Sequence, residues 1–196
     1  MPSPYSLAME IPAFHLGNRL LTADMVERAQ AGDRDAFDGL AAGSYDRLYA
    51  VAYRMLRDAQ AAEDAVQEAL IKAWRDLRSL RELDRFDAWM HRLLVRACYD
   101  QARQRRRISV EVGDIAIERL DPTDDYARVA NRDELERAFL HLTMEHRAVL
   151  VLTHYVGLPA PEVARILGIP AGTVYSRLHY AVRTMRTAIA TPEHSK

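Results

Sequence analysis

Apolar residues recur three or four positions apart through most of the first half of the chain, as they do on one face of a helix. One such stripe contains Leu48, Val51, Ala52, Met55 and Leu56. Successive stripes predict four amphipathic helices, and none of the four segments alternates as a strand would. Residues 22–107 are therefore expected to form one α-helical domain.

The predicted helix boundaries rest on residues that cap helix ends. The candidate N-caps, whose side chains accept hydrogen bonds from free backbone N–H groups, are Thr22, Asp33, Asp58 and Asp84. Gly32 should end the first helix, because glycine readily adopts the left-handed conformation found there. The second helix contains two glycines, Gly39 and Gly43, and we expect a break near Gly43.

The helical pattern resumes in residues 132–191, which predict a second domain. Its first helical face carries Leu135, Ala138, Phe139 and Leu142, and its next carries Ala148, Val149, Leu152 and Tyr155. Thr143 can cap the second of these helices, which should stop at Gly157. Two further helices follow before residue 191.

The remaining segments lack helical periodicity. Residues 108–131 are rich in Gly, Asp and Pro, and their short alternating stretch would be a strand without a partner. Residues 1–21 contain three prolines and are expected to be a loosely structured extension. The expected fold is all-α, with two small helical domains joined by an acidic flexible linker.

Composition narrows the class of protein. A chain of 196 residues with 49% hydrophobic and 28% charged residues is typical of a globular protein. It has no apolar run of about eighteen residues and no signal-peptide pattern, so we expect a cytoplasmic protein without membrane insertion. The single cysteine, Cys98, lies in an apolar helical pattern and should be a buried small hydrophobic residue.

The sequence offers little for catalysis. His91, His141, His146 and His154 are scattered without a metal-binding spacing, and no Gly-rich phosphate loop or nucleophile elbow occurs. We therefore predict no metal site, no cofactor and no enzymatic activity.

Charge is unevenly distributed, although the formal net charge is only −1. Residues 96–107 contain five arginines and one acid, and residues 171–189 contain three arginines and no acid. Between them, residues 108–136 contain nine acids and three arginines. This order places one basic stretch in each predicted domain, with an acidic connector between them.

Residues 158–186 fit a helix-turn-helix. A short helix from about Pro161 to Leu167 should end at Gly168, and a longer helix should begin near Ala171. Its inward residues would be Val174, Leu178, Ala181 and Met185, and its outward candidates for DNA contact are Thr173, Tyr175, Ser176, Arg177, His179 and Arg183. Hydroxyls suit phosphates, and Arg177 could reach a guanine. A plain helical hairpin with a solvated polar face would produce a similar pattern.

The helix predicted at residues 58–77 has an uncommon outward face. The residues expected to face the core are Val66, Leu70, Ala73, Trp74 and Leu77, and those opposite them are Asp64, Gln67, Glu68 and Ile71. An outward Ile71 with a polar rim is typical of a protein-interface anchor. A solvated face with one exposed isoleucine fits the pattern equally well.

The last helix of the first domain combines aromatic and basic side chains. Its basic residues are Arg92, Arg96, Arg103, Arg105, Arg106 and Arg107, and Trp89 lies near its start. Guanidinium groups bind phosphates and rings stack on bases, a combination suited to single-stranded nucleic acid. A solvated basic helix end is the alternative, because cations are favoured at helix C-termini.

These motifs resemble those of extracytoplasmic-function (ECF) sigma factors of the sigma-70 family. The run DAVQE at residues 64–68, followed by Lys72-Ala73-Trp74, is similar to the core-polymerase-binding region 2.2. The pattern Phe86-x-x-Trp89-x-x-Arg92-Leu93, through Asp100 and the arginine run, resembles regions 2.3 and 2.4, which melt and read the −10 promoter element. Residues 135–186 resemble region 4, whose helix-turn-helix reads the −35 element.

The resemblance implies a sigma factor with three partners: core RNA polymerase, promoter DNA and an anti-sigma factor. It implies that polymerase is bound by Asp64, Gln67, Glu68 and Ile71. It assigns the −10 element to Trp89, Arg92, Arg96, Asp100, Arg103, Arg105, Arg106 and Arg107. It assigns the −35 element to Thr173, Tyr175, Ser176, Arg177, His179 and Arg183.

The sequence departs from the family pattern at both promoter-reading helices. Arg96 stands where an asparagine is common, and Tyr175 and Tyr180 stand where basic residues are common, so the bases read are left open. A dimeric helix-turn-helix regulator that does not bind core polymerase is the alternative function. It would explain residues 158–186 and predict a palindromic site, but not the face around Ile71 or the arginine-rich helix end.

Overall fold

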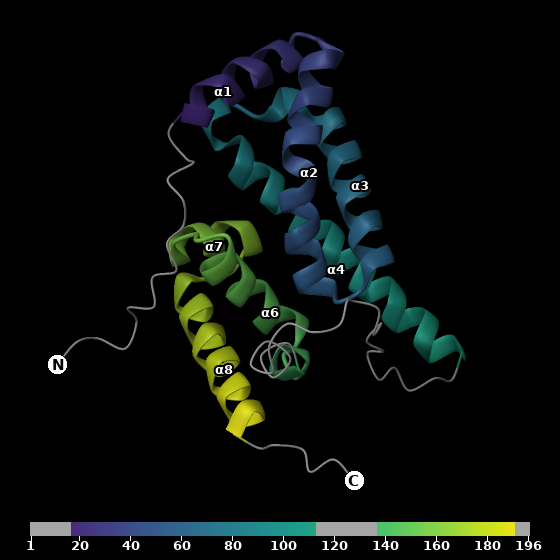
Figure 1. Cartoon of the computed structure of the whole chain (residues 1–196), viewed down its shortest axis with the longest axis vertical. Helices are drawn as coiled ribbons and strands as arrows, with labels where there is room; N and C mark the ends of the chain where they lie inside the picture. The colour runs from purple at the N-terminus through teal and green to yellow at the C-terminus, as the bar shows by residue number, and fades with distance from the viewer. Residues whose placement is uncertain (1–16, 113–136, 191–196) are drawn as a thin grey trace, which may run out of the picture.

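The computed structural model describes residues 17–112 and 137–190, all of whose regular elements are helical (Figure 1). This confirms the predicted all-α class. The helices α1–α4 form a first domain, and α6–α8 form a second domain. Residues 1–16 of the predicted extension (residues 1–21) and most of the predicted linker lie outside the described residues, whereas residues 17–21 are helical.

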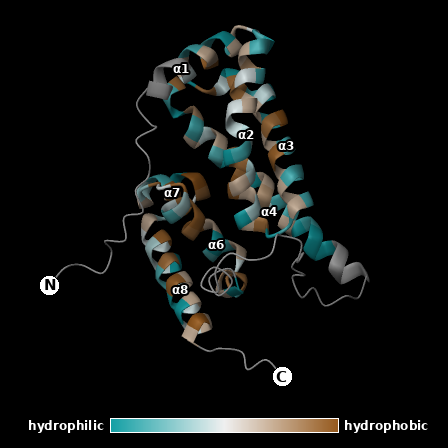
Figure 2. Ribbon diagram, viewed as in Figure 1, coloured by the Kyte–Doolittle hydropathy of each residue, from teal (hydrophilic) through white to brown (hydrophobic). Residues whose placement is uncertain are grey.

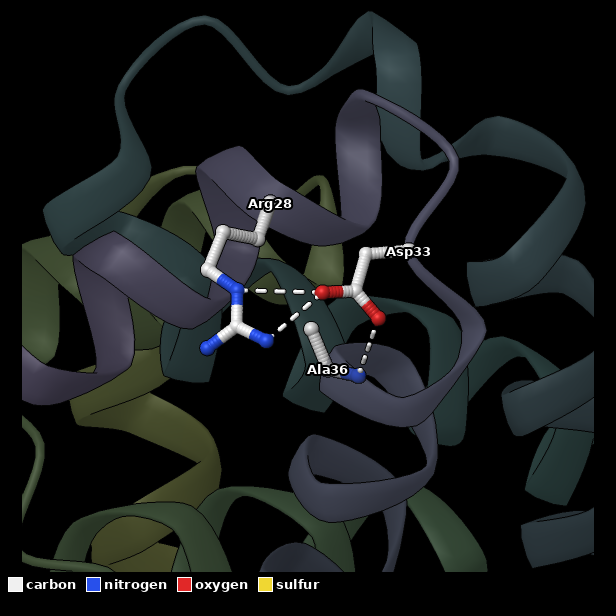
Figure 3. A network of polar contacts seen from close by, with 3 residues as sticks. All are labelled: Arg28, Asp33 and Ala36. Atoms are coloured by element: carbon white, nitrogen blue, oxygen red, sulfur yellow. Dashed lines mark hydrogen bonds and ion pairs between the residues drawn. The ribbon is translucent and has the colours of Figure 1, made fainter.

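Helix α1 (Gly17–Gln30) and helix α2 (Arg34–Leu56) meet at a tight turn. Gly32 has a φ of 102°, and the Asp33 carboxylate accepts a hydrogen bond from the Ala36 N–H at 3.1 Å, so both predicted boundaries are confirmed. Arg28 donates to the same carboxylate at 2.6 Å (Figure 3). The hydrogen bond from Ala36 and the Arg28 guanidinium lower the pKa of Asp33.

Two boundary predictions in these helices are wrong. Helix α1 begins at Gly17, so Thr22 lies inside it and is not its N-cap. Helix α2 continues through Gly39 and Gly43 without a break. A Cβ at Gly39 would lie 2.6 Å from the methyl group of the flexible Met25 side chain on α1, so a larger residue there would require that side chain to move.

Helix α3 (Ala59–Asp76) begins as predicted, because Asp58 accepts a hydrogen bond from the Ala61 N–H at 2.7 Å. Two short 3₁₀ turns, η1 (Leu77–Ser79) and η2 (Leu83–Arg85), lead to helix α4 (Phe86–Val112). The Gln30 amide donates to the carbonyls of Leu77 and Leu80, at 2.8 Å and 2.7 Å, and thereby fixes this connection against α1. Helix α4 extends past residue 107, so the first residues of the predicted linker are helical.

The second domain contains α6 (Met144–Leu150), the π-helical turn η3 (Val151–Tyr155), α7 (Ala160–Leu167) and α8 (Ala171–Ala190). Thr143 caps α6 by accepting a hydrogen bond from the His146 N–H at 3.4 Å. Gly157 and Gly168 have φ values of 81° and 67°, which confirms both predicted helix ends.

Tyr155 does not lie on the apolar face that the sequence predicts. It is 47% exposed, and the Arg54 guanidinium lies 3.8 Å from the centre of its ring. The π-helical turn accounts for the difference, because it adds residues to the turn and rotates the side chains that follow.

One apolar core runs through both domains. Helix α2 packs against α6 and η3, and α4 packs against α7 (Figures 1 and 2). Val95 of α4 and Val163 of α7 are buried members of this shared core. A smaller cluster, made by Ala138, Leu142, Ala181 and Met185, holds α8 to the start of its domain. The sequence predicts two domains but not their contact.

Cys98 is fully buried as predicted, and burial raises the pKa of its thiol to about 12. Among the described helices, none has the length and apolar character needed to cross a bilayer.

Candidate functional site

The outer side of α3 carries the four residues predicted to bind a protein. Gln67 and Ile71 are exposed, with Ile71 52% accessible, whereas Asp64 and Glu68 are half-buried. Glu68 forms an ion pair with Lys72 at 2.7 Å, and Asp64 accepts a hydrogen bond from Gln60 at 3.1 Å. These contacts hold the acidic side chains in place beside the exposed apolar one.

Trp74 also lies on this surface, contrary to the prediction that it faces the core. It is 41% exposed, and its ring meets the edge of Phe37 at a centroid distance of 4.9 Å. Together with Arg34 and Asp38, the two rings line an open hollow between α2 and α3. Ile71 and Trp74 are therefore two exposed apolar side chains, three residues apart, on one side of α3.

The buried face of α3 explains why Trp74 is displaced outward. This face consists mainly of small residues, which are Ala61, Ala62, Ala65, Ala69 and Ala73. Alanines let α2 and α3 approach closely, which leaves no room for an indole between them. The alanine spacing already completes a helical core stripe, and this signal in the sequence could have placed Trp74 outside it.

Helix α4 presents a basic stripe to solvent. Arg92, Arg96 and Arg103 are exposed and share one side of the helix, because they lie four and seven residues apart. The predicted aromatic partner, Trp89, is half-buried against Phe86, with ring centroids 6.1 Å apart. Phe86 itself is buried and anchors the start of the helix in the core.

The other predicted residues of α4 are placed differently. Asp100 lies between two cations, 3.9 Å from Lys72 and 3.7 Å from Arg103. Arg105 turns away from the stripe and pairs with Asp58 at 2.6 Å. Burial opposes ionisation of Asp58, but hydrogen bonds from the Ala61 N–H and Arg105 hold its pKa below the usual value.

The arginine run ends in two exposed residues, Arg106 and Arg107. The structure therefore brings Arg92, Arg96 and Arg103 together and directs Arg105 elsewhere.

Helix α8 follows the predicted inward pattern. Val174, Ala181 and Met185 are buried and Leu178 is half-buried. Its exposed residues include Tyr175, Ser176, His179, Tyr180 and Arg183. The two tyrosines are 60% and 55% exposed, so this face presents two aromatic rings to solvent beside its basic residues.

Two candidates on α8 are less accessible than predicted, because Thr173 and Arg177 are half-buried. Arg177 lies near Glu145 of α6 and Tyr99 of α4 and influences the titration of both. Burial and the Glu145 charge raise the pKa of Tyr99 to about 12, and Arg177 partly opposes them.

No metal site is evident in the parts of the chain that the structure describes. Within residues 17–112 and 137–190, no three His, Cys, Asp or Glu side chains gather closely enough to hold an ion. The polar surfaces described above are suited to binding macromolecules.

Two family profiles match the chain. Sigma-70 region 2 matches residues 40–108, and sigma-70 region 4 matches residues 132–185. The first match covers α3, most of α2 and the basic part of α4, and the second covers α6, α7 and most of α8.

Curated proteins are similar over most of their length. The ECF RNA polymerase sigma factor SigM of Mycobacterium tuberculosis is 32% identical over 180 residues, which are 90% of this chain and 88% of that protein. The RNA polymerase sigma-H factor of Pseudomonas aeruginosa is 32% identical over 84% of this chain and 92% of its own. The ECF RNA polymerase sigma factor SigW of Bacillus subtilis is 28% identical over 82% of this chain and 92% of its own length.

Solved structures share the fold. CnrH, in complex with the cytosolic domain of CnrY, has a TM-score of 0.62 and 25% identity over 88% of this chain and 99% of that one. The sigma factor RpoE of Bartonella quintana, in complex with the anti-sigma factor NepR, has a TM-score of 0.68 and 24% identity, over 80% of this chain and 98% of that one.

Proposed function

The chain belongs to the ECF group of sigma-70 RNA polymerase sigma factors, and on this premise we propose which surfaces carry each part of its function. As a sigma factor, it binds core RNA polymerase and directs initiation at particular promoters. Both halves of the chain match the family in the expected order, which disfavours a dimeric regulator that does not bind polymerase.

The polymerase-binding surface is the outer side of α3. Asp64, Gln67 and Glu68 supply its polar contacts, and Ile71 supplies an apolar one. The hollow beside Trp74 extends the surface toward α2. The observation that carries this assignment is the pair of exposed apolar side chains within a polar rim, because burying them is favourable only against a partner.

The −10 surface is the basic stripe of α4. Arg92, Arg96 and Arg103 bind phosphates of a single strand, and Trp89 offers its exposed edge to a base. Asp100 holds Arg103 in position, and the exposed Arg106 and Arg107 extend the positive charge. Arg105 contributes after it leaves Asp58.

The −35 surface is the exposed side of α8. Tyr175, Ser176, His179 and Arg183 face a major groove, with Thr173 at the helix start. The half-buried Arg177 is the candidate for reading a base. The exposed tyrosines favour apolar contact with thymine methyl groups over additional phosphate contacts.

We expect the protein to act in the cytoplasm, where its polymerase is, and to have no catalytic activity of its own. One solved structure with the same fold contains an anti-sigma factor. We propose that a protein of that kind restrains this chain as well.

The decisive test combines a pull-down on core RNA polymerase with run-off transcription. The wild-type chain should bind stoichiometrically and produce promoter-specific transcripts, and Asp64→Lys should abolish both without changing the circular dichroism spectrum. Glu27→Lys, the same charge reversal at an exposed position on α1, is the matched control and should behave as wild type. DNA binding by the wild-type chain without polymerase association would contradict the proposal.

A further inference from the structure

A row of ion pairs connects α3 to α4. Glu68 pairs with Lys72 at 2.7 Å, Lys72 lies 3.9 Å from Asp100 of α4, and Asp100 lies 3.7 Å from Arg103. These four residues are hereafter called the ion-pair row. Its two ends lie on different surfaces, because Glu68 belongs to the proposed polymerase-binding surface and Arg103 to the proposed −10 surface.

The backbones that carry the ion-pair row are held in place by the core. Helices α3 and α4 pack against each other there. Their fully buried small residues include Ala65, Ala69, Ala97 and Cys98. The side chains of the row are freer, since Lys72 is 36% exposed, Asp100 53% and Arg103 74%. Close packing leaves a backbone little room to shift, so these side chains are the parts that can rearrange.

Lys72 is shared by two carboxylates. Its ammonium sits on a flexible stem and can turn between partners, and the attraction between charges falls with distance. Glu68, at 2.7 Å, therefore holds Lys72 more strongly than Asp100 does at 3.9 Å. When another cation occupies the Glu68 carboxylate, Asp100 is left as the partner of Lys72.

Asp100 opposes strand binding as long as its charge is not neutralised. Its carboxylate repels phosphate and also engages Arg103, one of the three arginines of the basic stripe. An ammonium that closes on Asp100 removes the repulsion and weakens the attraction for Arg103. Arg103 is then available to a phosphate, with which a guanidinium makes strong charged hydrogen bonds.

Given the proposed function of these two surfaces, we propose that Lys72 couples them: polymerase binding at Glu68 transfers Lys72 to Asp100 and raises the affinity of α4 for the −10 strand. A partner that complements the acidic rim of α3 offers cations, and a cation at Glu68 replaces Lys72 there. Lys72 is a positioning residue, since it acts on the strand through Asp100 and Arg103. Coupling is reciprocal, so a bound strand tightens polymerase binding by the same factor.

The first test measures strand binding by the free, full-length chain, using fluorescence anisotropy of a labelled oligothymidylate at low salt. Glu68→Gln removes the charge that polymerase would neutralise. Because exposed ion pairs each contribute little, this variant should tighten binding about two- to fivefold. Asp64→Asn is the matched control, since it removes the same charge from the same side of α3, where Asp64 bonds to Gln60. It should tighten binding distinctly less.

Variants at Lys72 isolate the part that its charge plays. Lys72→Met keeps the aliphatic stem and removes the ammonium, so adding Glu68→Gln to it should change binding no more than Asp64→Asn does. Lys72→Arg restores a cation and should restore the response to Glu68→Gln. Arg75→Met removes a charge from an exposed position on the same helix and should leave that response intact.

The second test adds polymerase. A promoter fragment with a single-stranded −10 region, chosen from the run-off transcripts, is titrated against the free chain and against chain saturated with core polymerase. Lys72→Met should weaken fragment binding about two- to fivefold more in the holoenzyme than in the free chain, because only there does Lys72 neutralise Asp100. Comparing variants within the holoenzyme cancels the contacts that polymerase itself makes with the fragment.

Three results would overturn the proposal: a Glu68→Gln effect no larger than that of Asp64→Asn, a Glu68→Gln effect that persists in the Lys72→Met chain, or equal losses from Lys72→Met in the free chain and the holoenzyme. A wild-type chain that binds no single strand would instead contradict the −10 surface, and the coupling would fall with it. Failure of the coupling alone is therefore distinguishable from failure of the proposed function.

Discussion

The two domains hold their DNA-reading helices in different ways. Helix α4 buries Phe86, Met90, Leu94, Ala97 and Cys98 among the other helices of its domain. Helix α8 buries only Val174, Ala181 and Met185 over its 20 residues. Helix α4 is therefore fixed along most of its length by buried side chains, whereas α8 is held at fewer buried positions, and α6 and α7 share an apolar core with the first domain.

The comparison is tested most strongly by substitutions that create one cavity in the core of each domain. Leu94→Ala removes a fully buried side chain and should cost about 2–5 kcal/mol of unfolding free energy. Val174→Ala removes two methyl groups' worth of buried surface and should cost about 1.5 kcal/mol. Urea unfolding of both variants provides the measurement, and equal losses would contradict the stated difference between the cores.

The hollow beside Trp74 predicts that two substitutions of this residue weaken polymerase binding to different degrees. Trp74→Ala should weaken binding to core polymerase by about 2 kcal/mol, roughly 30-fold, because it removes an exposed anchor. Trp74→Phe keeps an aromatic ring against Phe37 and should lose less. Titration of each variant against core polymerase measures the loss. A 30-fold loss accompanied by unfolding would show that Trp74 is structural.

Removing one N-cap side chain in each domain should produce smaller losses of stability than the core cavities. Asp58→Ala removes the 2.7 Å hydrogen bond between the Ala61 N–H and the Asp58 carboxylate, together with the ion pair with Arg105. It should lower the free energy of unfolding by about 1–2 kcal/mol. Thr143→Ala removes a cap at 3.4 Å and should cost about 0.5 kcal/mol. Thermal unfolding distinguishes the two variants, and a larger loss from Thr143→Ala would reverse the order.

Acid should act on the first of these caps. The lowered pKa of Asp58 means that its stabilising contribution is present above its ordinary value and is lost as pH falls through the lowered one. The difference in stability between wild type and Asp58→Ala should therefore shrink in strong acid. A difference that persists there would mean that the carboxylate charge is not what stabilises the helix.

The smallest expected effect concerns salt. Tyr175→Arg adds a cation to the exposed side of α8 and should steepen the salt dependence of promoter binding by about one phosphate contact. Arg103→Ala in α4 should make it shallower by a similar amount. Binding titrations across salt concentrations test both changes. An unchanged slope for Tyr175→Arg would place that position away from the phosphates.

Features decided by neighbouring residues could be predicted from the sequence. The caps at Asp33 and Asp58 and the left-handed turn at Gly168 depend on groups within a few positions along the chain. The inward residues of α8 follow from helical periodicity alone. The sequence also placed Ile71 outward, since the opposite side of α3 already supplies a complete core stripe.

The remaining features depend on contacts between distant segments. Helix α2 is continuous through Gly39 where it packs against α1, and the exposure of Trp74 reflects close packing of α3 against α2. The exposure of Tyr155 follows from a π-helical register, and Arg177 is half-buried although it was predicted to face outward. No local pattern encodes these outcomes.

The contact between the two domains has a consequence for biosynthesis. It includes a hydrogen bond that Arg147 of α6 donates to the Met55 carbonyl of α2. The partners of this bond are 92 residues apart, and the amino-terminal one is made first. At roughly 5–20 residues per second, the ribosome adds Arg147 about 5–20 s after Met55. Throughout that interval the first domain exists without the arginine that donates a hydrogen bond to the last turn of α2. Every newly made molecule therefore passes through a stage in which its first domain lacks this contact with the second.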